Sequence, residues 1–144
     1  MRRYRPPEAE YANGLIVRTA DIWALGCTFL EFLIWLHGGR NLLEEVEQEM
    51  TTRLIQGYGT IEYFDWVRMQ GTEQGGERYA IRVKNTVTRI DNIRQTCSQF
   101  AYDFLGIIRD RMLVVERYDR IWARELAQEM KILNLHHTSG RFSW

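Results

Sequence analysis

Few residues of this chain combine the types and the spacing that metal binding or bond-making chemistry requires. His136 and His137 are adjacent, and neighbouring side chains on a regular backbone do not aim at one ion, so we expect surface histidines here. The two cysteines, Cys27 and Cys97, are far apart, and Cys27 lies within an apolar stretch that predicts an inert thiol packed in a core. These residues predict no metal site.

The nucleotide-binding patterns are incomplete as well. The run Gly57-Tyr58-Gly59 begins like a phosphate-binding glycine loop, but Glu62 stands where the third glycine belongs, and no predicted strand precedes the run. Lys84 ends a predicted strand, again with no glycine loop before it. We therefore predict a turn at residues 57–59, and no catalytic or cofactor-binding residue in this chain.

The element that organises the chain is the apolar stretch from Thr19 to Gly39. At helical spacing both faces of this stretch are apolar. The first face carries Ile22, Leu25, Phe29, Phe32, Leu33 and Leu36, and the second carries Trp23, Cys27, Leu30 and Ile34. A helix that is apolar all round is buried in a larger body, which predicts one buried central helix. Thr19 is its expected N-cap, Asp21 a favourable first-turn acid, and Gly38-Gly39 its end. The uninterrupted apolar run is shorter than the roughly 20 residues that a bilayer requires, and Glu31 interrupts it, so we expect no membrane span.

The rest of the chain is predicted to be mainly α-helical, with one small β-hairpin. Asn41 and Ser98 are the expected N-caps of two further helices. Helices are expected at residues 7–11, 42–55, 85–95, 99–114 and 122–133, and strands at 61–69 and 78–83. The last residues, 136–144, lack periodicity and are expected to form a flexible tail.

Length and charge narrow the class of protein. The chain has 144 residues, with 19 basic and 19 acidic side chains, so one domain is expected and no global field favours nucleic acid or an anionic membrane. Two cysteines and no apolar leader indicate a reducing, intracellular setting, cytoplasmic or nuclear.

Three short motifs resemble, in the same order, motifs of the large lobe of protein kinases. Residues Tyr4–Glu8 (Y-R-P-P-E) are similar to the Y-x-[AP]-P-E sequence that closes a kinase activation segment. Residues Asp21–Cys27 (D-I-W-A-L-G-C) resemble the D-x-W-x-x-G-[CV] signature, and Arg120–Leu126 (R-I-W-A-R-E-L) resembles the R-[IL]-[ST]-A-x-x-L sequence before the last kinase helix. With the extension L-E-F-L-I-W-L-H-G-G at Leu30–Gly39, the chain is most similar to fungal serine/threonine-protein-kinase-like proteins. Residues 1–135 would then be a partial kinase domain, running from the end of the activation segment to the last helix.

The resemblance implies structural roles for the motif residues. Glu8 would pair with Arg120 through a charge-assisted contact, although both could instead be solvated charges. Asp21 would accept hydrogen bonds from the backbone of a catalytic loop, or act only as a first-turn acid. Trp23 and Gly26 would set the packing around the central helix. The motif residues taken together are Tyr4, Pro7, Glu8, Asp21, Trp23, Gly26 and Arg120.

The family's activity is ATP-dependent phosphorylation of serine and threonine in proteins, with ATP and Mg as cofactors of the complete domain. The sequence contains no H-R-D, D-F-G or V-A-I-K motif, so we expect the chain alone to be inactive. One hypothesis is a C-terminal kinase piece, truncated biologically or by gene prediction, whose partner is the missing N-terminal half. The alternative is a stand-alone kinase-like module that binds or scaffolds proteins through the region Leu42–Val83. An unrelated helical domain is a third possibility. On the first hypothesis, Ile22, Trp23 and their neighbours should form an uncovered apolar surface.

Overall fold

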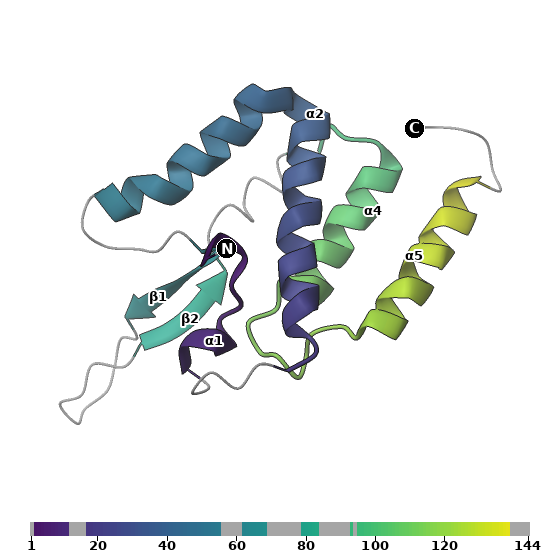
Figure 1. Cartoon of the computed structure of the whole chain (residues 1–144). Coiled ribbons are helices and arrows are strands. Elements are labelled where there is room, and N and C mark those ends of the chain that lie inside the picture. Colours follow the sequence, from purple (N-terminus) through teal and green to yellow (C-terminus); the bar gives the residue numbers. More distant parts are fainter. Residues whose placement is uncertain are drawn as a thin grey trace.

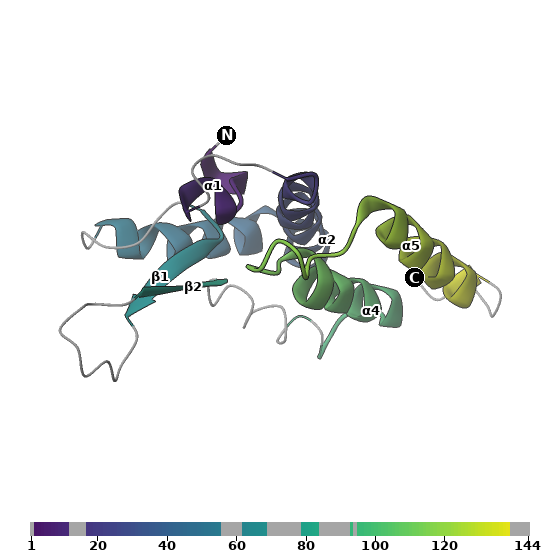
Figure 2. The same ribbon diagram turned by 90° about the horizontal axis from the view of Figure 1, so that it is seen from below.

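The computed structural model describes residues 2–11, 17–55, 62–68, 79–83, 93 and 95–138. This part is mainly helical, as predicted. Its elements are η1 (Arg2–Tyr4), α1 (Glu8–Tyr11), α2 (Ala20–Ile55), β1 (Phe64–Arg68), β2 (Tyr79–Val83), α4 (Gln99–Ile107), η2 (Ile108–Met112) and α5 (Ala123–Thr138). The first half of α2 passes through the middle of the molecule, with α4 and α5 on one side and α1 and the two strands on the other (Figure 1). The view from below shows the same division (Figure 2).

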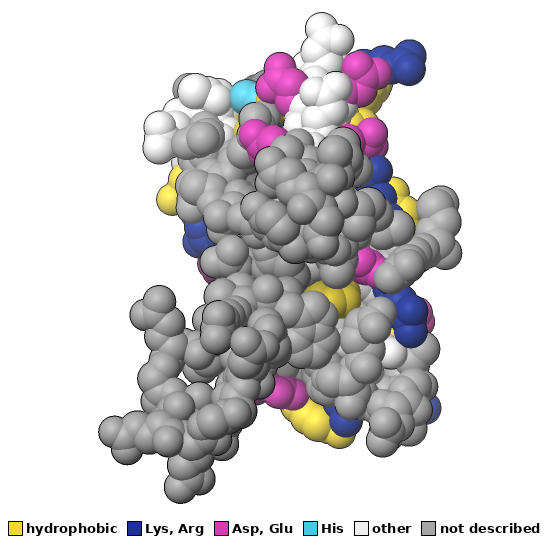
Figure 3. Space-filling view, turned by 90° about the vertical axis from the view of Figure 1, so that its left-hand side faces the viewer, with side chains coloured by type: hydrophobic (Ala, Val, Ile, Leu, Met, Phe, Trp, Pro, Cys, Tyr) yellow, Lys and Arg dark blue, Asp and Glu magenta, His cyan; other side chains and the backbone are white. Residues whose placement is uncertain are grey.

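Helix α2 consists of two helices joined at a break. Gly39 has φ 67° and ψ −164°, a non-helical, left-handed backbone conformation that glycine adopts without strain. The predicted helix end at Gly38-Gly39 therefore coincides with the break, and the predicted second helix follows it. Acidic side chains gather at the top of the face in Figure 3, over this second half, which carries Glu44, Glu45, Glu47 and Glu49.

The start of α2 differs from the prediction in one respect. Thr19 precedes the first helical residue, and its carbonyl accepts a 3.3 Å hydrogen bond from the Trp23 amide. Its hydroxyl, however, donates to the Arg117 carbonyl at 3.0 Å, and the side chain is buried. The predicted side-chain cap is therefore wrong, because a long-range bond takes the hydroxyl that would have served the helix.

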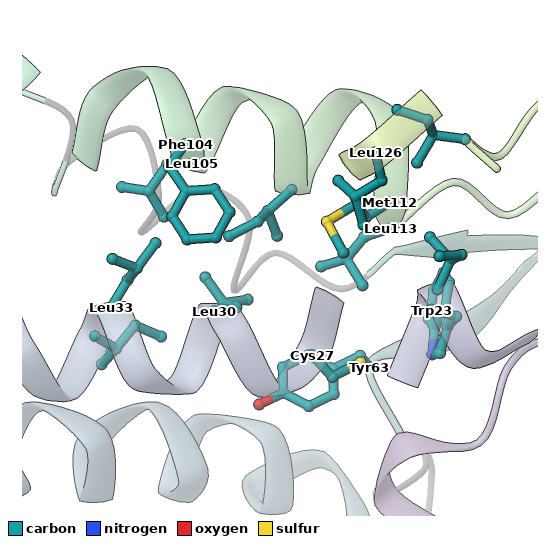
Figure 4. Packing of buried hydrophobic residues seen from close by; sticks show 14 of the residues in the cluster. Trp23, Cys27, Leu30, Leu33, Tyr63, Phe104, Leu105, Met112, Leu113 and Leu126 are labelled. Carbon is teal, nitrogen blue, oxygen red and sulfur yellow. The ribbon is translucent and has the colours of Figure 1, made fainter. Parts of the chain in front are cut away.

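The core lies between α2 and the segment α4–η2 (Figure 4). Trp23, Cys27, Leu30 and Ile34 on α2 are completely buried, and they pack in one cluster with buried residues of α4, η2 and α5: Phe104, Leu105, Ile108, Met112, Leu126 and Leu133. Burial of this size is the main favourable term in folding, at about 25 cal/mol per Å² of apolar surface. One of the two predicted apolar faces of α2 is therefore the core face.

The other predicted face is buried only in part, at Ile22 and Leu33, so the prediction of burial all round α2 is wrong. Its exposed residues are Leu25, Phe32 and Leu36, with exposed fractions of 37%, 55% and 62%, and Trp35, which stacks on Phe32, is 50% exposed. The predicted uncovered surface at Ile22 and Trp23 is also wrong, since these side chains are 4% and 0% exposed.

Length and composition alone would allow α2 to cross a membrane, over Ala20–Glu49, and 39% of its most apolar window is buried in the protein. This is weak evidence, because the core helix of a soluble protein passes the same test. The break at Gly39 divides this stretch, and Glu31 within it takes part in ion pairs and hydrogen bonds described below.

The C-terminal helices agree with the prediction at their starts more than at their ends. Ser98 caps α4, as predicted, and its hydroxyl accepts a 3.3 Å hydrogen bond from the Ala101 amide. The predicted helix 99–114 turns into the π-helix η2 after Ile107. Helix α5 continues to Thr138, past the predicted end at residue 133 and into the first residues of the predicted tail.

Strands β1 and β2 pair antiparallel, with Phe64 opposite Val83 and Arg68 opposite Tyr79. The predicted turn at residues 57–59, Lys84, most of the predicted helix 85–95 and residues 139–144 lie outside the described residues.

Candidate functional site

A buried ion pair joins an N-terminal residue of the chain to the segment before α5. Arg120 lies in the segment before α5, and Glu8 begins α1. The guanidinium Nη1 donates to Glu8 Oε1 at 2.8 Å and Nη2 donates to Oε2 at 3.0 Å, and both side chains are fully buried. This bidentate contact confirms the predicted pair, and the alternative of two solvated charges is wrong.

Every donor of the Arg120 guanidinium has a partner. Besides the two bonds to Glu8, Nη1 donates to the Thr19 carbonyl at 2.8 Å, while Nε and Nη2 donate to the Val114 carbonyl at 3.1 and 2.9 Å. These five bonds match the five N–H groups of a guanidinium. A buried charge is tolerated when it is paired and fully hydrogen-bonded. We call this arrangement the Glu8–Arg120 clamp; it ties α1, the start of α2 and the segment after η2 together.

Two of the predicted packing residues lie beside the clamp. The Arg120 guanidinium carbon lies 5.3 Å from the centre of the Trp23 ring, within the range of a cation–π contact. A Cβ added to Gly26 would lie 3.1 Å from Leu113 Cδ2 and 3.1 Å from Met112 Cβ, so the absence of a side chain allows α2 to approach the end of η2 closely.

The remaining motif residues differ in exposure. Pro7 is buried beside Glu8, and Tyr4 is half-buried. Asp21 is exposed in the first turn of α2, where its charge is favourable toward the positive end of the helix. The first-turn interpretation of Asp21 therefore holds, and the implied role toward a catalytic loop stays a prediction.

A second polar cluster, centred on Glu31, was not predicted. Its carboxylate accepts hydrogen bonds from the hydroxyls of Tyr4 at 2.7 Å and Tyr63 at 2.6 Å, and lies 2.8 Å from Arg3 Nη2. Arg3 also donates to Glu47 at 2.8 Å. Burial, with the neighbouring Glu31 carboxylate, raises the pKa of Tyr4 to about 12 and raises that of Tyr63 further. The cluster fastens η1 to both halves of α2; a glutamate inside an apolar run was its only signal in the sequence.

The candidate metal ligands and nucleophiles lie apart from one another. His137 Nε2 lies 3.0 Å from Asp103 Oδ2, which ties the last turn of α5 to α4. Within the part of the chain that the structure describes, no group of three or more metal-ligating side chains could hold an ion. Cys27 is free and buried, and burial raises the pKa of its thiol, which keeps the sulfur protonated and unreactive, as predicted.

No protein-family model, no curated protein and no solved structure matches this chain. The Glu8–Arg120 clamp is therefore the main feature from which a function can be inferred. Its role is structural, because it holds three segments of the chain together.

Proposed function

We propose that the chain is the helical part of a protein-kinase-type domain, and that it supports a phosphoryl-transfer site rather than forming one. The observation that carries the proposal is that all three kinase-like motifs meet at one guanidinium. Glu8 of the first motif binds it, Trp23 of the second lies against it, and Arg120 of the third supplies it. Three motifs spread along the chain have no local reason to meet at one buried ion pair.

On this proposal α2 is the central helix of the large lobe, and the paired strands β1 and β2 belong to an insert between lobe helices. The family activity is ATP-dependent phosphorylation of serine or threonine in proteins. Catalysis of this reaction consists mostly of positioning and charge stabilisation by residues that hold ATP and Mg. The corresponding motifs are absent from this sequence, so the chain by itself supplies support and not phosphate ligands. Asp21 is exposed, and could accept hydrogen bonds from the backbone of a catalytic loop.

A specific observation favours a second candidate, a stand-alone kinase-like module that binds other proteins. Ile22 and Trp23 would be poorly covered in a lobe that had lost its other half, yet they are buried within this chain. Further along α2, the apolar side chains of Phe32, Trp35 and Leu36 are exposed, and a protein partner of either kind could cover them.

The two candidates are separated by the coding sequence upstream of Met1 and by the behaviour of the protein. The kinase-type proposal expects an in-frame H-R-D followed by D-F-G upstream. It also expects that the chain alone binds a hydrophobic dye, and that co-expression with the upstream-encoded segment suppresses the dye signal and yields protein phosphorylation.

Arg120→Met is the control, because it breaks the clamp and should abolish the rescue. A chain that is a sharply melting, dye-silent monomer, with no upstream kinase motif, would contradict the kinase-type proposal and favour the stand-alone module.

A further inference from the structure

A pocket of about 320 Å³ opens at the start of α2, next to the Glu8–Arg120 clamp. One wall is formed by residues before α2 and the other by the segment before α5, with this lining: Val17, Arg18, Thr19, Arg117, Tyr118 and Trp122. Helices α2 and α5 both begin toward the lower end of the molecule in Figure 1. The lining residues belong to the two segments that precede these helices.

The side chains of the pocket are of the types that dominate protein interfaces. Tyr118 is 69% exposed and Trp122 is 56% exposed, although each could bury a large apolar surface. Binding hot spots are enriched in tryptophan, tyrosine and arginine, and this pocket has all three.

The charged side chains that line the pocket are all positive. Arg18 and Arg117 are its only charged side chains among the described residues, so the lining carries two positive charges and no carboxylate. Glu116 and Asp119 are exposed on the same segment but are not among the lining residues. The Arg117 guanidinium carbon lies 4.9 Å from the centre of the Tyr118 ring, which places a cation beside an exposed aromatic face.

The two walls are held in a fixed relation by buried contacts. The Thr19 hydroxyl donates to the Arg117 carbonyl at 3.0 Å, and Arg120 donates to the Thr19 carbonyl at 2.8 Å. Because these bonds are already made, a ligand would not have to order the pocket, and a preformed site reduces the entropic cost of binding.

We propose that this pocket docks an acidic segment of a partner protein, in which a carboxylate lies next to an aromatic or large aliphatic side chain. The carboxylate binds Arg18 and Arg117, since arginine forms two parallel hydrogen bonds to a carboxylate. The apolar side chain packs on Tyr118 and Trp122. A protein segment suits the pocket better than a nucleic-acid strand, because the chain has no net charge and the cations do not form a long stripe that phosphates could follow.

The test is a titration of the full chain against a fluorescently labelled, end-capped peptide, Glu-Glu-Phe-Glu-Glu, followed by fluorescence anisotropy. We expect saturable binding that weakens with added salt, as for partly exposed charges. The peptide with glutamine in place of each glutamate should bind at least about tenfold more weakly, because it loses the charge-assisted bonds. The double variant Arg18→Gln, Arg117→Gln and the single variant Trp122→Ala should each cause a similar loss.

Arg40→Gln is the matched control, since Arg40 is, like Arg18, an exposed arginine, but it lies in α2 outside the pocket, so its substitution should leave binding unchanged. Circular dichroism checks that each variant keeps its helical content, and Tyr118→Ala provides a second aromatic variant should Trp122→Ala unfold. No saturable binding, equal binding of the glutamine peptide, or equal loss with Arg40→Gln would overturn the proposal. Tighter binding of an oligothymidylate of the same charge would overturn it in favour of nucleic acid.

Discussion

Substitutions in the Glu8–Arg120 clamp should cause a large loss in the free energy of unfolding. Glu8→Gln removes the charge of the carboxylate and leaves a buried guanidinium without its counter-ion. Arg120→Met leaves the carboxylate buried and also removes the donors to the carbonyls of Thr19 and Val114. Breaking one side of a buried pair costs on the order of 3–5 kcal/mol. We expect Arg120→Met to lie at the upper end, because the Glu8 carboxylate and the carbonyls of Thr19 and Val114 each lose at least one hydrogen bond.

Such a loss is a large part of the 5–15 kcal/mol that stabilises a typical domain. Since each kcal/mol shifts the melting temperature of a domain of this size by about 2–4 °C, either variant should melt on the order of 10 °C lower. Urea unfolding followed by circular dichroism gives the free energy of unfolding of the wild type, both single variants and the double variant.

The double variant distinguishes a true pair from two independent packing defects. Once one charge is absent, removing the other costs less, so the double variant should be more stable than additivity predicts, by about 2 kcal/mol. Glu129→Gln is a matched control, because Glu129 forms a 3.3 Å ion pair with Arg111 but both side chains are around 40% exposed. Its cost should stay below about 1 kcal/mol. Strict additivity at Glu8 and Arg120, or a cost there as small as at the exposed pair, would refute the reasoning.

Three further predictions address the nucleotide, a helix cap and pH. The melting temperature of the chain alone should not change with millimolar Mg-ATP, because a ligand that binds only the native state would raise it by mass action. Ser98→Ala removes the hydroxyl that caps α4 at the Ala101 amide, and should lower the free energy of unfolding by about 1 kcal/mol, whereas Ser98→Thr should preserve most of it. Because the pKa of Tyr4 is raised to about 12 and that of Tyr63 is raised as well, both hydroxyls favour the folded state while protonated. This contribution to the free energy of unfolding is complete below the tyrosine pKa of the unfolded chain, about 10, and is lost as the pH rises toward the pKa values of the folded protein. In Tyr63→Phe, the decrease in the free energy of unfolding at alkaline pH, measured by urea unfolding, should be smaller than in the wild type. An equal decrease would contradict the role of Glu31.

The sequence predicted the features that depend on local rules or on a motif. Ser98 is followed by a helical apolar pattern, and its cap forms as the local rule requires. Gly38-Gly39 ends the first half of α2, because a left-handed residue at Gly39 is a backbone preference that needs no tertiary contact. The Glu8–Arg120 contact followed from the motif resemblance, since no local rule joins residues so far apart in sequence.

Features that depend on competition between contacts could not be predicted in this way. Thr19 has the residue type and position of an N-cap, but its hydroxyl bonds the Arg117 carbonyl, which only the folded chain brings within reach. Glu31 interrupts an apolar run and would be costly to bury alone; Tyr4 and Tyr63 offset that cost from segments whose positions the periodicity of α2 does not reveal.

The exposed apolar surface of α2 indicates where a protein partner would bind. Trp23 is covered by the Phe64 ring, 6.1 Å away between centres, and by the Arg120 guanidinium, so this chain's own residues bury that side chain. The most exposed large apolar side chains of α2 lie nearer the break at Gly39, where the Phe32 and Trp35 rings stack with 6.3 Å between their centres while at least half of each side chain remains exposed. If the proposed kinase-type function holds, the missing part of the domain should bury the Phe32–Trp35 pair and leave Trp23 unchanged, because, of the two, only that pair offers apolar surface that is still exposed to water.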